Sequence, residues 1–467
     1  MLRDYNLGQV DEKVSGKKVK LCGWIESLRI HGKVAFFDLR DRYGKVQCVI
    51  TSKNKNFEKV SKLNRESCLM VEGIINDRPK GSENKNIKSG KVELLIENIE
   101  LFNECPALPF EINDNISNEE LRLKYRFLDL RTDVLQKNIE LRSNFVKSIR
   151  DFMIRENFLE IETPILAKST PEGARDYIVP SRVHNGKFYA LPQSPQLYKQ
   201  LLMVAGFDKY FQISRCFRDE DLRSDRQPEF TQIDAEMSFV EEKDIFDFVE
   251  KLIKYAIKET FNKEIKIPFP RINYTDSIKK YQTDKPDLRK DKNNPEEFSF
   301  IWITNFPMFE YSETENKIVA AHHPFCMQDN IDNLDKDPLK IYAKSYDLVL
   351  NGVELLSGSI RVHKPEIQRK IFKILRLSEN EIEEKFGFLL NSFSYGAPPH
   401  GGFAIGLDRL IQILLKSNSI REVIAFPKNK EAKEIMLNSP SFIEKKQLKE
   451  VHIETIDSEK KVKSKRK

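Results

Sequence analysis

The sequence predicts an α+β protein with a small N-terminal β-barrel followed by a larger domain of helices and strands. Three observations predict this architecture. Five strand-like runs lie between about residues 17 and 102, with one short helical pattern between the third and fourth. Amphipathic helical patterns follow from Lys137 onward. Alternating runs also flank a charged stretch at 216–236, which predicts a further strand pair.

Composition narrows the class of protein. Hydrophobic residues make up 40% and charged residues 32%, which is typical of a soluble globular chain, and the net charge of +6 permits an RNA partner without requiring one. Six scattered cysteines without a Cys-x-x-Cys pair argue against zinc and disulfides and favour a reducing compartment. The polar N-terminus predicts no signal peptide, and no apolar run reaches the ~20 residues that span a bilayer. We therefore expect a cytoplasmic protein without a membrane partner.

The first element, residues 1–104, is the predicted barrel. Five strands with a helix between the third and fourth are the layout of an OB-fold, which binds single-stranded nucleic acid through aromatic and basic side chains. Phe36 and Phe37 are neighbours on one strand, so one must face the core and only the other can stack on a base. Arg29 and Gln47 accompany the exposed ring if their strands form the binding face.

An irregular segment, 105–136, reads as a hinge. Its basic string at 121–131 would contact RNA phosphates or form a solvated helix face. From Lys137 we expect a helix that ends near Glu156 and Asn157, followed by an edge strand interrupted by Pro164. Such a helix is more often part of a core than of an interface.

The charged stretch 216–236 predicts two strands joined by a long loop. Arg218 and Glu220 would share a face of the first strand, and Asp234 and Glu236 a face of the second. The planar guanidinium suits a phosphate, and carboxylates suit an amine. The alternative is a solvated, salt-bridged hairpin.

The amino-acid sequence of this stretch favours a specific family. FRDE, ending at Glu220, resembles the Phe-Arg-x-Glu signature called motif 2 of class II aminoacyl-tRNA synthetases, and DLRSDRQPEFTQID resembles that of aspartyl-tRNA synthetases. With motif 2 at about 210–236, the helix and strand at about 145–164 resemble motif 1. The glycine-containing stretch at about 396–415, with Gly-Leu-Asp-Arg at 406–409, resembles motif 3.

The resemblance implies a domain plan. The barrel would bind the anticodon, residues 137–440 would form a class II catalytic domain with an antiparallel sheet flanked by helices, and 441–467 would be an extension with a basic tail. Bacterial-type relatives carry a separate insertion domain after the text that ends here at Arg289. Only a short segment separates Arg289 from Trp302, so we expect this chain to lack that domain.

The implied reaction is ATP-dependent activation of L-aspartate, with Mg²⁺, followed by transfer to tRNA(Asp). Whether tRNA(Asn) is also charged stays open, and motif 1 implies a homodimer. Arg218, Glu220 and Arg409 would be catalytic. Aspartate would be bound by Glu172, Gln196, Lys199, Arg218, Asp234, His322 and Arg361. ATP would be bound by Arg218, Asp219, Glu220, Gln227, Glu354, Gly406, Leu407, Asp408 and Arg409. The ATP-bound Mg²⁺ would be held by Asp347 and Glu354, and the anticodon by Arg29, Phe36, Gln47, Arg78 and Glu93.

The residue types fit these roles. Gln196 and Lys199 are three apart on a predicted helix and look out of one side, although a lone lysine on a helix is usually solvated. Carboxylates suit a hard cation. Arg409 near a helix N-terminus suits a phosphate. We expect Arg361→Leu to abolish aspartate activation without affecting folding.

Three alternatives remain. An asparaginyl-tRNA synthetase would share the architecture, but Lys199 and Arg361 select a carboxylate. A decayed RNA-binding paralogue would explain Leu356-Ser357-Gly358, which stands where many bacterial relatives have three glycines, but the motif arginines and acids are complete. A tRNA-independent ligase of asparagine-synthetase type would not need the barrel. The adjacent histidines at 322 and 323 lack further ligands at zinc spacing.

Overall fold

The computed structural model describes residues 1–113, 118–169, 174–220, 222, 225–313, 316–321, 323–331, 334 and 336–456. Glu172 and His322, two of the predicted aspartate-binding residues, lie outside these ranges. The chain divides into two compact units, Met1–Leu121 and Arg122–Lys467. None of the helices in the described ranges is long and apolar enough to cross a membrane.

The first unit is a closed barrel with the strand order β1-β2-β3-β5-β4. Its strands are β1 (Lys18–His31), β2 (Val34–Arg40), β3 (Lys45–Thr51), β4 (Cys68–Asp77) and β5 (Val92–Asn103), with α1 (Phe57–Ser61) between β3 and β4. The OB-fold prediction is confirmed. In β2 burial alternates as far as Leu39, because Ala35, Phe37 and Leu39 are fully buried while Phe36 and Asp38 are not.

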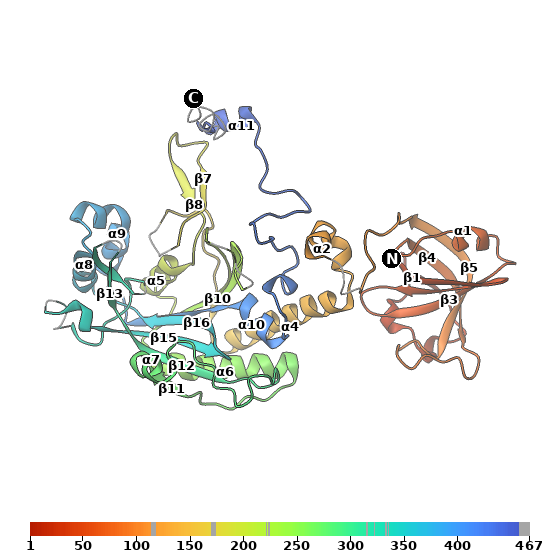
Figure 1. Ribbon diagram of the computed structural model, residues 1–467, viewed down its shortest axis with the longest axis horizontal. Coiled ribbons are helices and arrows are strands. Elements are labelled where there is room, and N and C mark those ends of the chain that lie inside the picture. The colour runs from red at the N-terminus through yellow and green to blue at the C-terminus, as the bar shows by residue number, and fades with distance from the viewer. Residues whose placement is uncertain are drawn as a thin grey trace, which may run out of the picture. The chain divides into compact units, whose positions relative to one another are not determined.

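The second unit is organised around an eight-stranded sheet with the order β11-β12-β15-β16-β17-β10-β9-β6 (Figure 1). The strands are β6 (Leu159–Glu160), β9 (Lys209–Phe217), β10 (Glu229–Ser238), β11 (Arg271–Asn273), β12 (Phe300–Pro307), β15 (Tyr342–Leu350), β16 (Val353–Ile360) and β17 (His400–Gly406). The pairs β11–β12 and β6–β9 at the two ends are parallel and the remaining pairs are antiparallel. The predicted antiparallel sheet flanked by helices is therefore confirmed.

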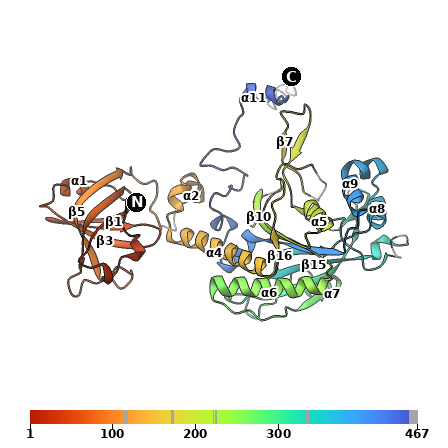
Figure 2. The same ribbon diagram turned by 180° about the vertical axis from the view of Figure 1, so that it is seen from behind.

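One face of this sheet is covered by helices α4 (Asp133–Arg155) and α6 (Glu242–Phe261), which lie side by side in both views (Figures 1 and 2). Ile233, Ala235 and Met237 of β10 belong to the apolar core on this side, together with residues of α4, α6 and α10 (Leu407–Leu414). Because side chains alternate along a strand, Asp234 and Glu236 must face the other side. The functional site lies there.

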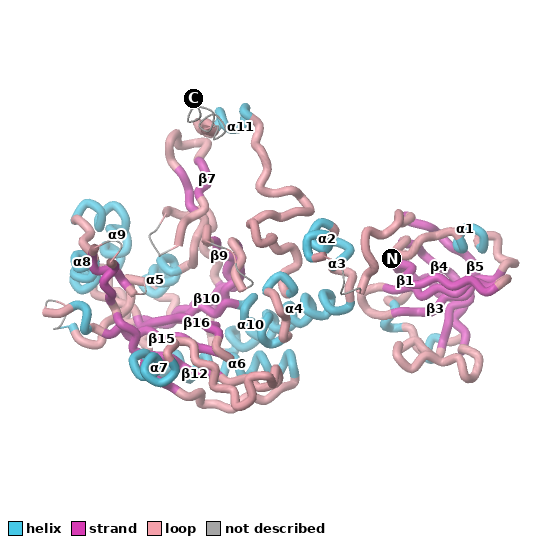
Figure 3. Tube along the Cα trace, viewed as in Figure 1, coloured by secondary structure: helices cyan, strands magenta, loops and turns pink. Residues whose placement is uncertain are grey.

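The other side carries α5 (Gln196–Val204), α8 (Pro365–Ile374), α9 (Glu379–Phe393) and the hairpin β7 (Ile178–Pro180)–β8 (Phe188–Ala190). Further elements are α2 (Glu119–Lys124), α3 (Arg126–Asp129), α7 (Tyr274–Tyr281) and the hairpin β13 (Phe309–Ser312)–β14 (Lys317–Ala320). After α10 the chain runs as a mostly irregular segment to the short helix α11 (Lys445–Glu450), drawn as loop in Figure 3. We call residues 420–429 of this segment the C-terminal strap.

Three element boundaries differ from those predicted. Helix α4 begins at Asp133, before Lys137, because the Thr132 hydroxyl accepts a hydrogen bond from the Leu135 amide (3.4 Å) and caps the helix. The strand before Pro164 is only Leu159–Glu160. Strand β9 ends at Phe217, so Arg218 and Glu220 lie in the loop beyond it, although both still face the site.

Candidate active site

A cavity of about 580 Å³ opens on the polar side of the sheet. Its wall is formed by α5, β10, β16, the loop between β9 and β10, and the junction of β17 with α10. The predicted residues that line it are Gln196, Lys199, Arg218, Glu220, Gln227, Asp234, Glu354, Arg361, Gly406, Asp408 and Arg409. Residues separated by more than 200 positions in the sequence thus meet in one polar cavity.

The floor of the cavity is a buried array of two cations and two anions. Lys199 donates a hydrogen bond to Asp234 Oδ2 at 2.8 Å and lies 3.4 Å from Glu236 Oε2. Arg361 donates from Nε to Glu236 Oε1 (2.9 Å) and from its second terminal nitrogen to Oε2 (3.3 Å). All four residues are at most 1% exposed, so each charge depends on its neighbours.

The two acids of this array differ in pKa. Burial raises the pKa of Asp234 to about 6, more than the attraction of Lys199 lowers it. Burial also acts on Glu236, but the charges of Arg361 and Lys199 outweigh it and hold its pKa below the usual value. One oxygen of Asp234, Oδ1, accepts no hydrogen bond within the described structure. A substrate ammonium would satisfy that oxygen.

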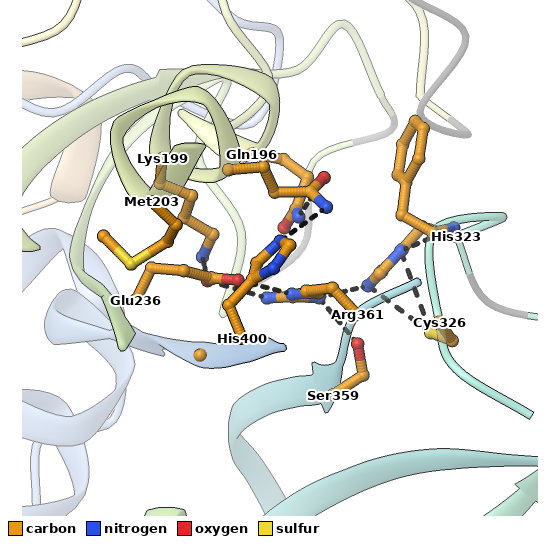
Figure 4. Close-up of polar contacts among 12 residues, drawn as sticks. Gln196, Lys199, Met203, Glu236, His323, Cys326, Ser359, Arg361 and His400 are labelled. Carbon is orange, nitrogen blue, oxygen red and sulfur yellow. Dashed lines mark hydrogen bonds and ion pairs between the residues drawn. The ribbon is translucent and has the colours of Figure 1, made fainter. Parts of the chain in front are cut away.

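Arg361 is also held from the opposite side (Figure 4). Its remaining terminal nitrogen donates to Ser359 Oγ and lies 2.7 Å from His323 Nε2. A Cβ on Gly402 would collide with Glu236 Oε2, so this glycine makes room for the acid that orients the arginine. To bind both oxygens of a substrate carboxylate, Arg361 must give up one of its present hydrogen bonds to Glu236, Ser359 or His323.

Gln196 is oriented by a buried relay. Its amide nitrogen donates to Gln200 Oε1 (3.1 Å), and the Gln200 amide nitrogen lies 3.2 Å from His400 Nε2. His400 Nδ1 lies 2.8 Å from the carbonyl of Pro398, so Nδ1 carries the proton and Nε2 accepts. Burial lowers the pKa of His400, which keeps the ring neutral. No group in the described part of the chain is seen to donate to the Gln196 carbonyl oxygen, which can accept a hydrogen bond from a ligand.

The opposite end of the cavity carries the arginines expected to meet phosphates. Arg218 lies over the Phe230 ring at 5.2 Å, and its Nε has no hydrogen-bond partner among the described atoms. Arg409 donates to the main-chain oxygen of Glu354 (2.7 Å) and lies 3.4 Å from Asp225 Oδ2. Glu220 pairs with Arg226 at 3.2 Å. Two guanidiniums with donor capacity to spare suit a polyphosphate.

Two carboxylates at this end fit a divalent cation. Asp347 is 4% exposed, and its Oδ1 accepts no hydrogen bond within the described structure. Burial, and next the charge of Glu354, raise the pKa of Asp347 well above its usual value. A buried carboxylate beside a half-buried one, each repelling the other, fits Mg²⁺. Within the described ranges no three His, Cys, Asp or Glu residues cluster as a metal site of protein ligands alone.

The C-terminal strap holds the site together. The Gln227 amide binds both the carbonyl (3.0 Å) and the amide (2.8 Å) of Lys428, so its polar atoms are used within the protein. Arg142 of α4 bonds to Thr231 (3.2 Å) and to the Val423 carbonyl (3.2 Å) and pairs with Asp408. Asp408 accepts the Thr231 amide at 2.7 Å.

Three predicted residues do not line the cavity. Leu407 belongs to the apolar core. The Asp219 amide donates to the Arg175 carbonyl, and the Asp219 carbonyl accepts from Arg175 Nε (3.0 Å). Asp347 is buried and is not one of the lining residues. Sequence reasoning missed Glu236 as the partner of Arg361. It considered His323 only as a metal ligand, and it missed His400 and Lys285 altogether. Only Glu236 left a signal, as a third polar residue on one strand face.

On the barrel, four of the five predicted anticodon residues lie on strands β1, β2, β3 and β5, and Arg78 follows the end of β4. Phe36 pairs in register with Arg29, and Asp38 with Gln47. Gln47 donates to Glu93 at 2.8 Å. Arg78 is only 8% exposed and donates to the Val92 carbonyl (3.0 Å).

Comparison with known proteins decides the family. Residues 118–430 match the model described as tRNA synthetases class II (D, K and N), and residues 19–102 match that of an OB-fold nucleic acid binding domain. The chain belongs to the class II tRNA synthetases. This membership accounts for the sheet, the barrel and the order of the three motifs.

Curated relatives in this family match over nearly the whole chain. An aspartate–tRNA(Asp/Asn) ligase from Dictyoglomus turgidum is 43% identical over 588 positions, covering 99% of each chain. One from Hydrogenobaculum is 43% identical over 591 positions, covering 97% of this chain and 100% of the relative. Because this chain has only 467 residues, these alignments include many positions that it lacks, as expected if an insertion domain is absent.

Solved structures show the same fold. Asparaginyl-tRNA synthetase from Pyrococcus horikoshii, complexed with asparaginyl-adenylate, superposes with a TM-score of 0.76 at 24% identity over 91% of this chain and 98% of its own. Aspartyl-tRNA synthetase from Entamoeba histolytica gives a TM-score of 0.69 at 24% identity over 90% of each chain. At such identities the likeness concerns the fold alone.

Proposed function

We propose that this protein is a cytoplasmic aspartate–tRNA ligase that activates L-aspartate with ATP and transfers it to tRNA(Asp). The observation that carries this proposal is the buried array of Lys199, Asp234, Glu236 and Arg361 in a class II synthetase cavity. The names of the curated relatives agree with it.

The array explains the selection of aspartate. The side-chain carboxylate would lie between Lys199 and Arg361, and the ammonium would meet Asp234 Oδ1 and the Gln196 carbonyl. Asparagine would bring an uncharged amide, whose NH₂ group cannot accept a hydrogen bond from Lys199 or Arg361. Sites built around buried polar groups discriminate by factors of about 10⁴ when a partner is missing. The same reasoning argues against an asparagine-specific enzyme.

The chemistry needs positioning and charge stabilisation more than a protein nucleophile. The α-carboxylate of aspartate attacks the α-phosphorus of ATP, and pyrophosphate leaves with both bonding electrons. Arg218 stabilises the negative charge on the reacting phosphate, and Arg409 binds the far end of the triphosphate. Asp347 and Glu354 would hold Mg²⁺, which supplies further neutralisation of phosphate charge when bound.

The decisive experiment is aminoacylation with radiolabelled aspartate and two transcripts, tRNA(Asp) and tRNA(Asn). Charging of tRNA(Asp) supports the proposal, and charging of tRNA(Asn) as well identifies a non-discriminating enzyme. Charging of neither transcript by folded protein would favour a decayed RNA-binding paralogue. Labelled asparagine, offered in parallel, tests the asparaginyl alternative.

We also propose a homodimer formed through α4 and β6. β6 ends the sheet order, and Ile154, Leu159, Ile165 and Leu166 are 49–61% exposed there. Exposed apolar clusters of this kind mark protein interfaces. Leu166→Asp should convert the dimer to monomer in sedimentation velocity, whereas Leu437→Asp, at an exposed site in the irregular segment between α10 and α11, should not.

A further inference from the structure

Lys285 reaches the phosphate end of the cavity from the segment between α7 and β12. Its ammonium nitrogen lies 2.7 Å from Glu354 Oε2, and its side chain is 41% exposed. Lys285 lies outside the three motifs of the family. Its ammonium contacts Glu354, one of the two carboxylates that fit a divalent metal ion.

The position of Lys285 is set by its own segment. The Lys285 amide donates to the Thr283 hydroxyl (3.1 Å), and the Thr283 carbonyl accepts from Ser277 (2.8 Å). Gly352, in the turn between β15 and β16, has a φ of +82°, and a Cβ there would lie 3.3 Å from Asp287. The segment therefore rests closely on the turn that leads to Glu354. The position of Lys285 at the edge of the cavity is therefore fixed by contacts of its own segment.

The charges around Lys285 are predominantly negative. Glu354 is in contact, and Asp347 and Asp284 act on it at longer range. Asp347 has a buried oxygen without a hydrogen-bond partner within the described structure. One carboxylate in contact with the ammonium and a second at longer range give a negative surrounding that a divalent cation would otherwise neutralise.

We propose that Lys285 is a further nucleotide-binding residue that occupies the place of the metal at Glu354 until ATP arrives. A divalent cation that binds Glu354 and Asp347 must displace the ammonium from Glu354. The displaced ammonium remains on the wall shared with Arg218 and Arg409, where it meets the phosphates. This inference rests on the proposed function, because it assigns a residue to the ATP subsite.

The competing interpretation is an ordinary half-exposed ion pair, which contributes little. The two interpretations differ in what removal of the charge does. Loss of a mere ion pair changes neither metal nor nucleotide binding. Loss of a place-holding cation changes them in opposite directions, because the carboxylates become more available to metal while the phosphates lose a partner.

The test compares Lys285→Met with Lys290→Met, the same change at an exposed lysine of the same segment. Mn²⁺ binding to the protein without ATP is measured by electron paramagnetic resonance, and the KM for ATP by aspartate-dependent ATP–pyrophosphate exchange. We expect Lys285→Met to bind Mn²⁺ several-fold more tightly and to raise the KM for ATP about tenfold, as for loss of one charge-assisted hydrogen bond. The KM for aspartate should be unchanged, and Lys285→Arg should restore most of the ATP affinity.

Unchanged Mn²⁺ affinity, or an unchanged KM for ATP, in folded Lys285→Met would overturn the inference. Thermal melting by circular dichroism shows whether the variant is folded. Failure of the proposed function is recognised separately, because the wild-type protein would then show no aspartate-dependent exchange at all.

Discussion

At the scale of single residues, the selectivity of the site depends on ion pairs between buried cations and buried carboxylates. Arg361 is oriented by Glu236, Ser359 and His323 before any ligand binds, and Lys199 by Asp234. A cation fixed by an internal partner loses little side-chain freedom on binding. It also leaves a buried charge behind when it is removed.

Arg361→Leu therefore has two expected effects. Aspartate activation should fall at least about a thousandfold, because the carboxylate loses its partner. Contrary to the expectation from sequence, stability should fall as well, by about 3–5 kcal/mol, because the buried Glu236 loses its closest partner and keeps only Lys199, at 3.4 Å. Exchange kinetics and urea unfolding measure the two effects, and Arg361→Lys, which keeps the charge, should lose less of both. Near-normal exchange in Arg361→Leu would refute the assignment.

Asp234 makes aspartate binding depend on pH. With a pKa of about 6, its carboxylate gains a proton as the pH falls through 6, and its attraction for the substrate ammonium is lost in that direction. At pH 5 about one tenth of the sites remain ionised, so the KM for aspartate should be about tenfold higher than at pH 8. Aspartate itself does not titrate in this range. Asp234→Asn should have a high KM that stays flat between pH 5 and 7.

The sequence predicted the site residues that are recognisable by residue type and motif, such as Arg218, Lys199 and Arg409. It could not predict their partners. The pairing of Glu236 with Arg361 depends on how β10 and β16 align against β17, a contact across 125 positions that no local pattern records. The relay through His400 depends on the same alignment.

At the scale of elements, helix α4 and the C-terminal strap position the loop between β9 and β10. Arg126, just before α4, donates to the carbonyls of Arg421 (2.8 Å), Ile424 (2.9 Å) and Ala425 (2.9 Å). It also pairs with the buried Asp129. Near its other end the strap binds Gln227 in the loop, through Lys428. Arg126 thus helps to position the loop that borders the ATP subsite.

Removing this anchor should loosen both the fold and the nucleotide site. We expect Arg126→Met to destabilise the second unit by about 3 kcal/mol or more, because Asp129 and three carbonyls lose a buried partner. The KM for ATP should rise while the KM for aspartate changes little. Differential scanning calorimetry and exchange kinetics measure these effects. Lys137→Met, at an exposed position of α4, is the control and should match the wild type.

At the scale of the whole molecule, two units divide recognition. The barrel carries the candidate anticodon residues, and the second unit contains the complete cavity for amino acid and nucleotide. The alternation of strands predicted the barrel and required one of Phe36 and Phe37 to face the core. The choice of Phe36 for the anticodon came from the family resemblance, and in the structure Phe37 is buried and Phe36 is half-buried. Helix ends were less predictable, because the cap at Thr132 competes with equally plausible starts downstream.

Phe36→Ala should separate the two activities. Loss of one stacked base costs about 1–3 kcal/mol, so the KM for tRNA in aminoacylation should rise about five- to a hundredfold. Exchange of pyrophosphate without tRNA should be unaffected, since the cavity lies in the other unit. Tyr43→Ala, an exposed aromatic in the turn between β2 and β3, serves as the matched control. A loss of exchange in Phe36→Ala would contradict this division.

The order of strands in the sheet also has a consequence for synthesis on the ribosome. β10 is flanked by β9, which is made just before it, and by β17, which begins 162 residues after the end of β10 at Ser238 and is the last strand of the sheet. Until β17 is synthesised, the edge of β10 that carries Asp234 and Glu236 therefore has no partner strand. The hydrogen bonds between Gln227 and Lys428 form later still. Premature termination anywhere before the last strand leaves the growing sheet open, a state prone to aggregation. The active site can therefore be completed only near the end of synthesis, after β17 and Lys428 have been added to the chain.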